Sequence, residues 1–429
     1  MRQEFLSSSP PQPAIRDAMA KAAERKQKGL PVFDFSSGNV GNLPLNQTFF
    51  SKVELRINQG LPTELRVLAE GLKEGLINSY HPRPLGLAYS PTGGTWPIKN
   101  LVIQYFREVH GVPLSDVDTN RVIVTAGGQQ AMTASLRSLR PGVKVLLSRW
   151  EYAPVPSILR DRHLNEVRIE ATEDFSINVE DLNKKADKGS VFYISTPNNP
   201  TGYFSPEDLS TVAEIMSANR GGVIWDAPYL FTVLRITSNG ARFDRAFLQE
   251  KLTKLKRTTK KYHQNLCILS SLSKTCLIAG LRFGFATASK LWIENMNAII
   301  GRENLSSPTS SFIVGAEILK RFLEIPISHE WLCKVLANRL TILMKEIPDQ
   351  LILPGKGAFG ALYVLVKTKQ EGMKVAEKLI KEHGIVTVAG NQFYGGPVNA
   401  LRLSLVSVPW SEGDQAWVQS VRALKKVLA

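Results

Sequence analysis

The sequence predicts an α/β protein, with a large domain built on a mostly parallel β-sheet between helices and a smaller α+β domain. The first observation is length. A chain of 429 residues is too long for a single small domain, since a domain typically has roughly 150 residues. The second is a repeat of short, continuous apolar runs separated by stretches that favour helices. Such runs are typical of parallel strands buried on both faces. The third is a change of rhythm near residue 300, where long helical patterns replace the alternation.

The N-terminal part begins with a polar, proline-rich lead and continues with an amphipathic pattern. We expect a helix over residues 14–28 that ends at Gly29. A short strand at Phe33 follows and runs into a loop that carries Gly38. Residues 60–110 have a mostly helical composition, interrupted by a turn-rich segment.

The large domain is predicted from apolar runs of roughly four to eight residues. The runs cover 121–125, 143–148, 191–196, 223–226, 266–270 and 281–288. Helices are expected between several of them, as over 129–139 and 206–218. Strands that alternate with helices predict the crossover units of a parallel sheet.

The smaller domain is predicted from long helical patterns followed by separate strands. Helices are expected within 313–347, strands at 361–366, 385–388 and 401–406, and a closing helix at 412–427. We therefore divide the chain into an N-terminal arm with part of the small domain at 1–48, a large domain at 49–300 and a C-terminal small domain at 301–429.

The composition is that of a soluble globular chain. Hydrophobic residues make up 43% and charged residues 21%, and no apolar run reaches the about 20 residues of a membrane helix. We expect no membrane partner and, since the N-terminus lacks the apolar core of a signal peptide, a cytoplasmic location. The three cysteines and six histidines show no metal-ligand spacing, so no metal is expected.

The net charge of +15 is partly local, because lysines and arginines crowd into residues 251–261. We interpret this run as a solvated helix face or loop. Aromatic residues do not interleave with these charges, as binding to single-stranded nucleic acid would require. No nucleic-acid partner is therefore expected.

Polar residues follow several of the predicted strands, at the edge where the ligands of a parallel sheet collect. A glycine turn with Gly128 and Gln129 follows the first run and opens a helix, whose N-terminal amides suit a phosphate. The third run leads into Pro-Asn-Asn-Pro-Thr-Gly, which contains Asn199. The fourth ends in Asp226, with Tyr229 three residues later. A buried carboxylate at this position needs a cationic or hydrogen-bonding partner.

The fifth run ends in a serine-rich segment with Ser271 and Lys274, and Arg282 follows eight residues after the lysine. Each feature alone has an ordinary explanation as a tight turn or a surface charge. Together they supply an amine for an aldehyde, a carboxylate for a pyridine nitrogen, hydroxyls and amides for a phosphate, and donors for a ring oxygen. This set meets the requirements of pyridoxal phosphate, if the lysine is desolvated enough to be neutral.

The motifs at 197–202, 226–229 and 271–274, together with Arg282, resemble the class I/II pyridoxal-phosphate aminotransferases of fold type I. Their order and approximate spacing match from about Phe33 to Leu405. The resemblance implies an aspartate aminotransferase-like fold, whose large domain binds pyridoxal 5'-phosphate. It implies that Lys274 is the Schiff-base lysine and proton shuttle. The cofactor-binding residues that it implies are Gly128, Gln129, Tyr152, Asn199, Asp226, Tyr229, Ser271, Lys274, Arg282 and Tyr89.

In the family pattern Asp226 keeps the pyridine nitrogen protonated, while Asn199 and Tyr229 bond the ring hydroxyl oxygen. The Gly128-Gln129 turn, with Ser271 and Arg282, holds the phosphate. The substrate-binding residues that the resemblance implies are Gly38, Asn199 and Arg402, and the guanidinium fork of Arg402 would clamp the α-carboxylate.

Two aromatic positions complete the resemblance. Tyr89 is similar to the tyrosine that reaches the phosphate of the neighbouring subunit, which implies a homodimer. Tyr152 is our choice for the aromatic ring that stacks on the cofactor. The usual proline-tyrosine pattern is absent there, so Trp150 is a rival for the same role.

The function implied is transfer of an amino group between an α-amino acid and a 2-oxo acid. Residues 295–300 and 390–393 are faintly similar to valine-pyruvate aminotransferases. An eliminating lyase of the cysteine-S-conjugate type would use the same cofactor geometry and is the alternative within the superfamily. An aminotransferase-like regulatory protein is the alternative of another class. It would need a DNA-binding module, and only about thirty residues precede the strand at Phe33.

Overall fold

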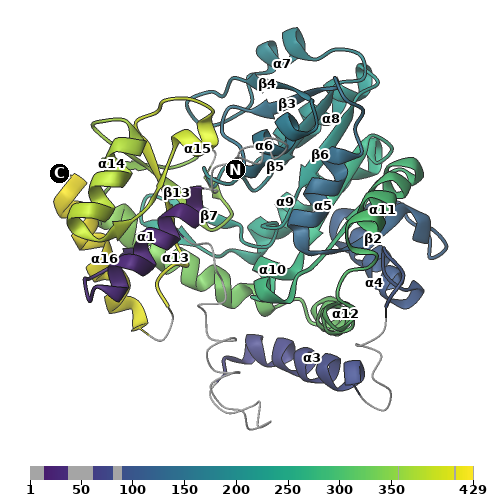
Figure 1. Cartoon of the computed structure of the whole chain (residues 1–429), viewed down its shortest axis with the longest axis horizontal. Coiled ribbons are helices and arrows are strands. Elements are labelled where there is room, and N and C mark those ends of the chain that lie inside the picture. Colours follow the sequence, from purple (N-terminus) through teal and green to yellow (C-terminus); the bar gives the residue numbers. More distant parts are fainter. Residues whose placement is uncertain (1–13, 37–60, 81–88, 356, 410–411, 429) are drawn as a thin grey trace, which may run out of the picture.

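The computed structural model describes residues 14–36, 61–80, 89–355, 357–409 and 412–428. Its centre is a seven-stranded sheet (Figure 1). The strands in spatial order are β2 (Val122–Ala126), β10 (Phe283–Thr287), β9 (Leu266–Ser271), β6 (Gly222–Asp226), β5 (Val191–Ser195), β3 (Lys144–Ser148) and β4 (Asn165–Ile169). Strand β10 runs antiparallel to β2 and β9, and the pairs from β9 to β4 are parallel.

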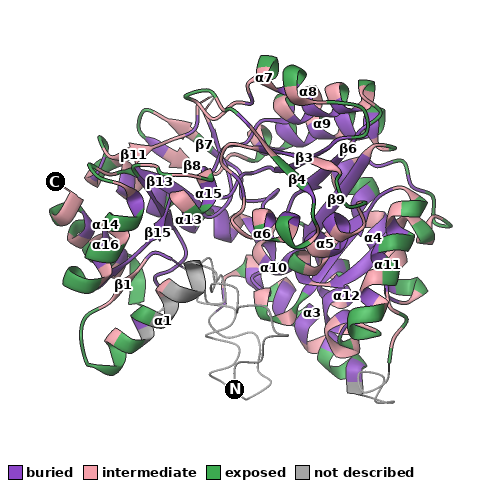
Figure 2. Ribbon diagram, turned by 45° about the horizontal axis from the view of Figure 1, so that its top comes forward, coloured by how far each residue is buried: buried purple, intermediate pink, exposed green. Residues whose placement is uncertain are grey.

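Helices cover both faces of this sheet, because successive side chains of each buried strand point to opposite faces. On β2, Ile123 belongs to one apolar core and Val122 and Val124 to the other. The first core is covered by α5 (Gly127–Arg137), α6 (Pro154–Asp161) and α11 (Lys290–Asn304). The second is covered by α4 (Trp96–Tyr105), α8 (Pro206–Ala218), α9 (Arg245–Tyr262) and α12 (Thr309–Glu324). Burial is concentrated along the sheet between these layers (Figure 2).

Further helices complete the larger part of the molecule. Helix α3 (Thr63–Tyr80) packs against α12, which is seen end-on in Figure 1. The remaining elements here are the π-helical turn η3 (Phe106–His110), the 3-10 turns η4 (Thr119–Arg121) and η5 (Ala279–Leu281), and the helices α7 (Val179–Lys185) and α10 (Leu272–Thr275). The basic run lies on α9, where Lys254 pairs with Glu207 and Glu250.

The smaller part is built on a four-stranded antiparallel sheet. Its strands in spatial order are β11 (Leu351–Ile352), β13 (Tyr363–Lys367), β16 (Ala400–Ser404) and β15 (Val388–Ala389). Its helices are α13 (Ser328–Glu346), α14 (Gly372–Lys378), the π-helical turn η6 (Leu379–His383), α15 (Asn391–Tyr394) and α16 (Gly413–Leu428). A three-stranded sheet combines strands from both parts of the chain. It consists of β12 (Ala358–Phe359), β7 (Leu234–Thr237) and β8 (Gly240–Arg242).

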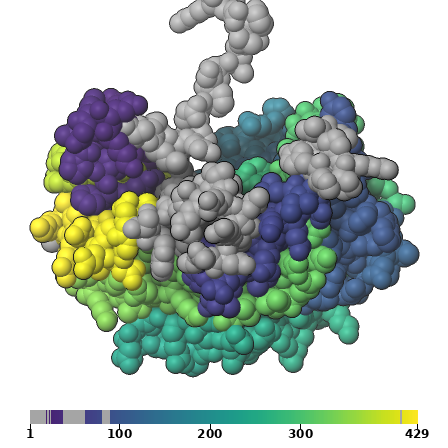
Figure 3. Space-filling view, turned by 90° about the horizontal axis from the view of Figure 1, so that it is seen from below, coloured from purple at the N-terminus to yellow at the C-terminus, as the bar shows by residue number. Residues whose placement is uncertain are grey.

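The N-terminal segment joins the C-terminal part rather than the large sheet. Strand β1 (Phe33–Asp34) pairs in parallel with β14 (Ile385–Val386). The next residue extends this connection, because the Phe35 carbonyl accepts a hydrogen bond of 2.7 Å from Ser404 N. Helix α1 (Ala14–Gln27) lies beside the C-terminal elements, as the purple and yellow surfaces of Figure 3 show. Residues 33–36 are thereby brought to β16, the strand that carries Arg402.

The predicted fold class is confirmed, and most expected elements occur. Two details differ. Strand β4 was not predicted, because its Asn-Glu-Val-Arg-Ile sequence is partly exposed at the sheet edge and has no apolar run. The helices expected within 313–347 are α12, which begins slightly earlier at Thr309, and α13. The division of the chain at residues 48 and 300 stays a prediction. Among the described residues, no helix is both long enough and apolar enough to cross a membrane.

Candidate active site

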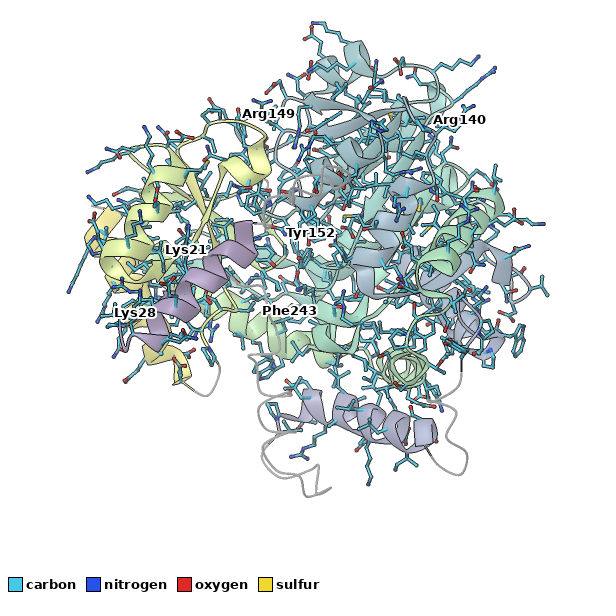
Figure 4. All side chains as sticks on the ribbon, viewed as in Figure 1. Lys21, Lys28, Arg140, Arg149, Tyr152 and Phe243 are labelled. Atoms are coloured by element: carbon cyan, nitrogen blue, oxygen red, sulfur yellow. The ribbon has the colours of Figure 1, made fainter. Side chains whose placement is uncertain are left out.

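The predicted site residues gather where β5, β6 and β9 end and α5 begins. Asn199 lies in the loop that follows β5. Asp226 is the last residue of β6, and Ser271 is the last residue of β9. Strand β16 of the smaller part brings Arg402 to Asn199. In Figure 4, Tyr152 lies near the middle of the molecule, between the large sheet and the C-terminal elements.

The start of α5 forms one corner of the site. Gly127 has φ +79°, and a Cβ atom there would lie 2.5 Å from Arg282 Nη2. A Cβ atom on Gly128 would lie 3.4 Å from Cβ of Ser271, and one on Gly284 would lie 2.4 Å from the Gly127 carbonyl carbon. The glycines therefore allow a guanidinium, a hydroxyl and free helix N-H groups to converge. Such a corner suits a phosphate.

Arg282 is held in an unusual conformation at this corner. Its φ of 59° lies in the left-handed region, which is strained for a residue with a Cβ atom. The guanidinium donates to two backbone carbonyls, Ala279 O at 2.9 Å and Ala126 O at 3.4 Å. Arg282 is nevertheless exposed, so its charge is available to a ligand at the start of α5.

Lys274 lies on the single turn of α10, directly after β9. Ser271 caps this turn, because its Oγ accepts a hydrogen bond of 3.0 Å from Ser273 N. The same hydroxyl lies 2.6 Å from Ser273 Oγ and 3.0 Å from the Phe283 carbonyl oxygen. The strand end and its cap thus fix where the lysine leaves the backbone.

Asp226 is buried at the end of β6, with only 9% of its surface exposed. Tyr193 donates a hydrogen bond of 2.6 Å to its Oδ2 atom. Burial raises the pKa of Asp226 to about 6, and the hydrogen bond from Tyr193 opposes this shift. A cationic partner would oppose this shift further and favour the ionised carboxylate.

A second buried carboxyl group, Glu151, lies close to Asp226. Its carboxylate accepts hydrogen bonds from Tyr152 N at 2.7 Å and Ser195 N at 3.0 Å. Burial raises the pKa of Glu151 to about 7, although these hydrogen bonds oppose the shift. Glu151 therefore fixes the backbone of Tyr152 relative to β5.

Arg402 is fully buried, at 0% exposure. Nη1 donates to Asn199 Oδ1 at 3.1 Å and Nη2 to the Ser36 carbonyl oxygen at 2.6 Å. The guanidinium carbon lies 4.0 Å from the ring centre of Tyr363 and 4.9 Å from that of Phe393. Its Nε atom has no hydrogen-bond partner, and no Asp or Glu among the described residues forms an ion pair with the group. A buried cation with neutral neighbours attracts an anionic ligand.

Tyr363 links the arginine to the cofactor-binding residues. Its hydroxyl forms a hydrogen bond with that of Tyr229, and both side chains are buried. Burial alone raises the pKa of Tyr363, but the Lys274 ammonium, the Arg402 guanidinium and the Tyr229 hydroxyl together hold it below its ordinary value. Lys274, Tyr229 and Arg402 therefore belong to one electrostatic cluster.

Tyr152 and Trp150 lie in different surroundings, although they are two residues apart. The hydroxyl of Tyr152 donates to Gln129 Oε1 at 3.2 Å, at the start of α5. Trp150 packs against Tyr394 of α15, with 4.8 Å between the ring centres. The structure therefore brings Tyr152 to the predicted site and directs Trp150 to the small-domain helix.

One predicted residue, Tyr89, has an exposed side chain, with 84% of its surface accessible on the described chain. Gly38 lies outside the described residues. Gln129 is an exposed residue in the first turn of α5, where it contacts Tyr152. No group of three His, Cys, Asp or Glu side chains that could hold a metal occurs in the described ranges.

Sequence reasoning missed Tyr193, Glu151 and Tyr363. Tyr193 and Tyr363 lie within apolar strand runs, where an aromatic residue is normally interpreted as part of the hydrophobic core. Glu151 offers a weak signal, since a carboxylate beside a predicted stacking aromatic, directly after a buried strand, has to be satisfied in the interior.

The fold is that of aspartate aminotransferases. The structure is similar to the aspartate aminotransferase of Thermus thermophilus solved with maleate, with a TM-score of 0.79 at 20% identity, covering 100% of both chains. It is also similar to the aspartate aminotransferase of Thermotoga maritima, with a TM-score of 0.75 at 16% identity, covering 97% of both chains. These likenesses establish the architecture around the site.

The sequence family model for aminotransferase class I and II matches residues 73–415, and the chain belongs to this family. The aspartate aminotransferase of Pyrococcus horikoshii is 24% identical over 350 residues, which cover 79% of this chain and 83% of that protein. A histidinol-phosphate aminotransferase of Mannheimia succiniciproducens is 28% identical over 295 residues, covering 68% and 76%. The protein is thus an aminotransferase, of a family that depends on pyridoxal phosphate and acts on amino acids and 2-oxo acids. The faint resemblance to valine-pyruvate aminotransferases stays a prediction.

Proposed function

We propose that the chain binds pyridoxal 5'-phosphate through Lys274 and exchanges amino groups between an α-amino acid held by Arg402 and a 2-oxo acid. The observation that carries this proposal is the buried Arg402 guanidinium. It has no carboxylate partner among the described residues and has an unpartnered Nε, yet it adjoins Asn199 and, through Tyr363, Lys274. The α-carboxylate of an amino acid matches its charge and planar fork.

The residues present fit the cofactor. The start of α5, Ser271 and Arg282 offer amide, hydroxyl and guanidinium donors for its phosphate. Asp226 offers a buried carboxylate, which needs a cationic partner such as a protonated pyridine nitrogen. Asn199 and Tyr229 would hold the ring hydroxyl oxygen, and Tyr152 would stack on the ring.

When bound, pyridoxal phosphate supplies an aldehyde for the substrate amine and a ring that accepts the electron pair left on the substrate α-carbon. Lys274 provides the amine that binds the cofactor and then carries the proton away from the α-carbon. Arg402 orients the substrate by its carboxylate, and the buried walls from Tyr363 and Phe393 exclude water around that contact.

A homodimer is part of the proposal. Tyr89 would reach the phosphate in the neighbouring subunit, and its 84% exposure leaves the side chain available to a second copy. Activity of the full-length protein as a monomer by light scattering would contradict this arrangement. Gly38 is proposed to face the substrate through its backbone.

The first experiment tests the reaction. The purified protein is mixed with a panel of amino acids and either 2-oxoglutarate or pyruvate, and the new amino acid is measured. We expect transfer that depends on both substrates. Release of ammonia and pyruvate from a cysteine conjugate without any acceptor would favour the eliminating lyase instead.

The second experiment tests Lys274. We expect the purified protein to absorb visible light, and borohydride to fix the cofactor to the peptide that contains Lys274. Lys274→Ala should bind the cofactor without covalent fixation and should lose transfer by at least about a thousandfold, because both the covalent link and the proton carrier are removed. Mass spectrometry of the reduced protein reads the attachment, and cofactor fixed to the variant would overturn the assignment.

A further inference from the structure

We propose that Tyr193 is a positioning residue for the cofactor. Its hydroxyl holds Oδ2 of Asp226, so that Oδ1 is directed to the ring nitrogen. The inference rests on the proposed function, because it takes Asp226 as the partner of that nitrogen. No motif in the sequence marks Tyr193, which lies inside the apolar run of β5.

The sheet register places the two side chains together. Strands β5 and β6 are parallel, with Tyr193 opposite Ile224 and Ser195 opposite Asp226. Residues two apart on a strand share a face, so Tyr193 and Asp226 are diagonal neighbours on one face of the sheet. Tyr193 and Ile224 both belong to the core under α5 and α6. The tyrosine side chain therefore approaches Asp226 along the face of the sheet that α5 and α6 cover.

The hydrogen bond has the geometry of a charge-assisted contact. The hydroxyl oxygen of Tyr193 lies 2.6 Å from Oδ2, and the ring is fully buried. Tight packing fixes the ring and with it the position of the donor. A carboxylate held through one oxygen cannot rotate freely, and its second oxygen then has a defined direction.

The contact also favours the ionised carboxylate. Burial raises the pKa of Asp226, and the hydroxyl of Tyr193 lowers it. Glu151, Tyr152 and Tyr229 are titratable groups that act on this pair, and all three are acids. Tyr193 is a side-chain hydrogen-bond donor to Asp226, and its bond is the one that acts on the pKa of that carboxyl group. Without it, a larger fraction of Asp226 would be protonated and unable to hold a protonated ring nitrogen.

The test compares Tyr193→Phe with Tyr105→Phe. Tyr105 is a matched control, because it is also buried and its hydroxyl lies 3.0 Å from Ser270 Oγ, in the core on the other face of the sheet. The apoenzyme of each variant is titrated with pyridoxal phosphate, and the visible spectrum of the loaded protein is followed with pH. We expect Tyr193→Phe to raise the dissociation constant about tenfold and to shift the spectral pH midpoint, because one hydrogen bond to a charged group is lost.

Asp226→Asn separates the inference from the proposed function. If this variant changes neither the affinity for the cofactor nor the spectrum, the role of Asp226 itself fails. If Asp226→Asn has an effect and Tyr193→Phe behaves like Tyr105→Phe, the inference alone is overturned. Because Tyr193 is proposed to act through Asp226, Tyr193→Phe should add less than twofold in the Asp226→Asn background.

Melting temperatures of the apoenzymes control for folding. We expect Tyr193→Phe and Tyr105→Phe to lower them similarly, while only the former changes the spectrum. If Tyr193→Phe does not fold, Tyr193→Met replaces it, because the flexible methionine side chain fills irregular core space. An unchanged cofactor affinity in a folded Tyr193→Met protein would likewise overturn the inference.

Discussion

Two arginines of the site, Arg282 and Arg402, have opposite surroundings. Arg282 is exposed, is held by two backbone carbonyls and lies beside the N-terminus of α5. Arg402 is fully buried, lies over the rings of Tyr363 and Phe393 and has an unpartnered Nε. The first lies beside helix amides that would share its anion, whereas the hydrogen-bond acceptors and rings around the second are all neutral.

The contrast between these surroundings indicates which anion each arginine suits. An exposed guanidinium next to backbone amides contributes one part of a larger, additive phosphate site. A buried guanidinium keeps a large desolvation penalty until a carboxylate arrives, so it discriminates strongly between ligands with and without that group. We therefore expect Arg282 to govern retention of the cofactor and Arg402 to govern recognition of the substrate.

The largest effect is expected from Arg402→Met. The substitution removes the buried charge with little loss of volume, and kcat/KM for amino acids should fall by roughly 100- to 1,000-fold because a bidentate contact is lost. Cofactor affinity should change less than about threefold. The small change is expected because Asn199 Oδ1 loses the hydrogen bond that Arg402 donates to it. Steady-state kinetics and a cofactor titration measure the two quantities.

Arg402→Lys is the matched variant. It keeps the charge but not the planar fork, so its kcat/KM should lie between those of the wild type and Arg402→Met. If Arg402→Met weakened cofactor and amino acid equally, the division of roles between the two arginines would be wrong.

A smaller and opposite pattern is expected from Arg282→Ala. The dissociation constant for pyridoxal phosphate should rise about tenfold, because one charge-assisted contact to the phosphate is lost while the amides of α5 and Ser271 remain. At saturating cofactor, KM for the amino donor should return to the wild-type value. Arg282→Lys should recover part of the affinity, and a lasting rise in KM at saturating cofactor would count against the comparison.

Residues that follow buried strands could be predicted from the sequence. Asn199, Asp226, Ser271 and Lys274 stand directly after apolar runs, and the parallel topology brings such positions to one edge. The apolar runs themselves also predicted the central strands of the sheet. This approach failed for β4, whose pairing with β3 depends on edge position rather than on an apolar pattern.

Contacts between distant segments could not be predicted. The sequence favoured Tyr152 for the stacking role and left Trp150 as a rival, and the two differ in the structure because Tyr394 packs against the tryptophan. Tyr363 reads as a core residue of β13, and only the pairing of Leu365 with Arg402 brings it under the guanidinium. Such roles follow from register and packing, which local sequence does not specify.

The smallest effect is expected from Tyr363→Phe, which tests whether the two anion sites are coupled. The variant keeps the ring under Arg402 and loses the hydrogen bond to Tyr229. Removing one hydroxyl bond should lower kcat/KM only about three- to tenfold. The loss should appear in the cofactor spectrum and affinity, because Tyr229 is proposed to hold the ring hydroxyl oxygen of the cofactor.

Tyr363→Leu also removes the ring that faces the guanidinium, so KM for the amino acid should rise further while cofactor affinity stays at the Tyr363→Phe value. Comparing the two variants by kinetics and cofactor titration thus separates the hydroxyl from the ring. If Tyr363→Phe raised KM as much as Tyr363→Leu, the hydroxyl rather than the stacked ring would shape the carboxylate contact. Arg402 would then depend on the same hydrogen-bond chain as the cofactor, and the two anion sites would be coupled through Tyr363.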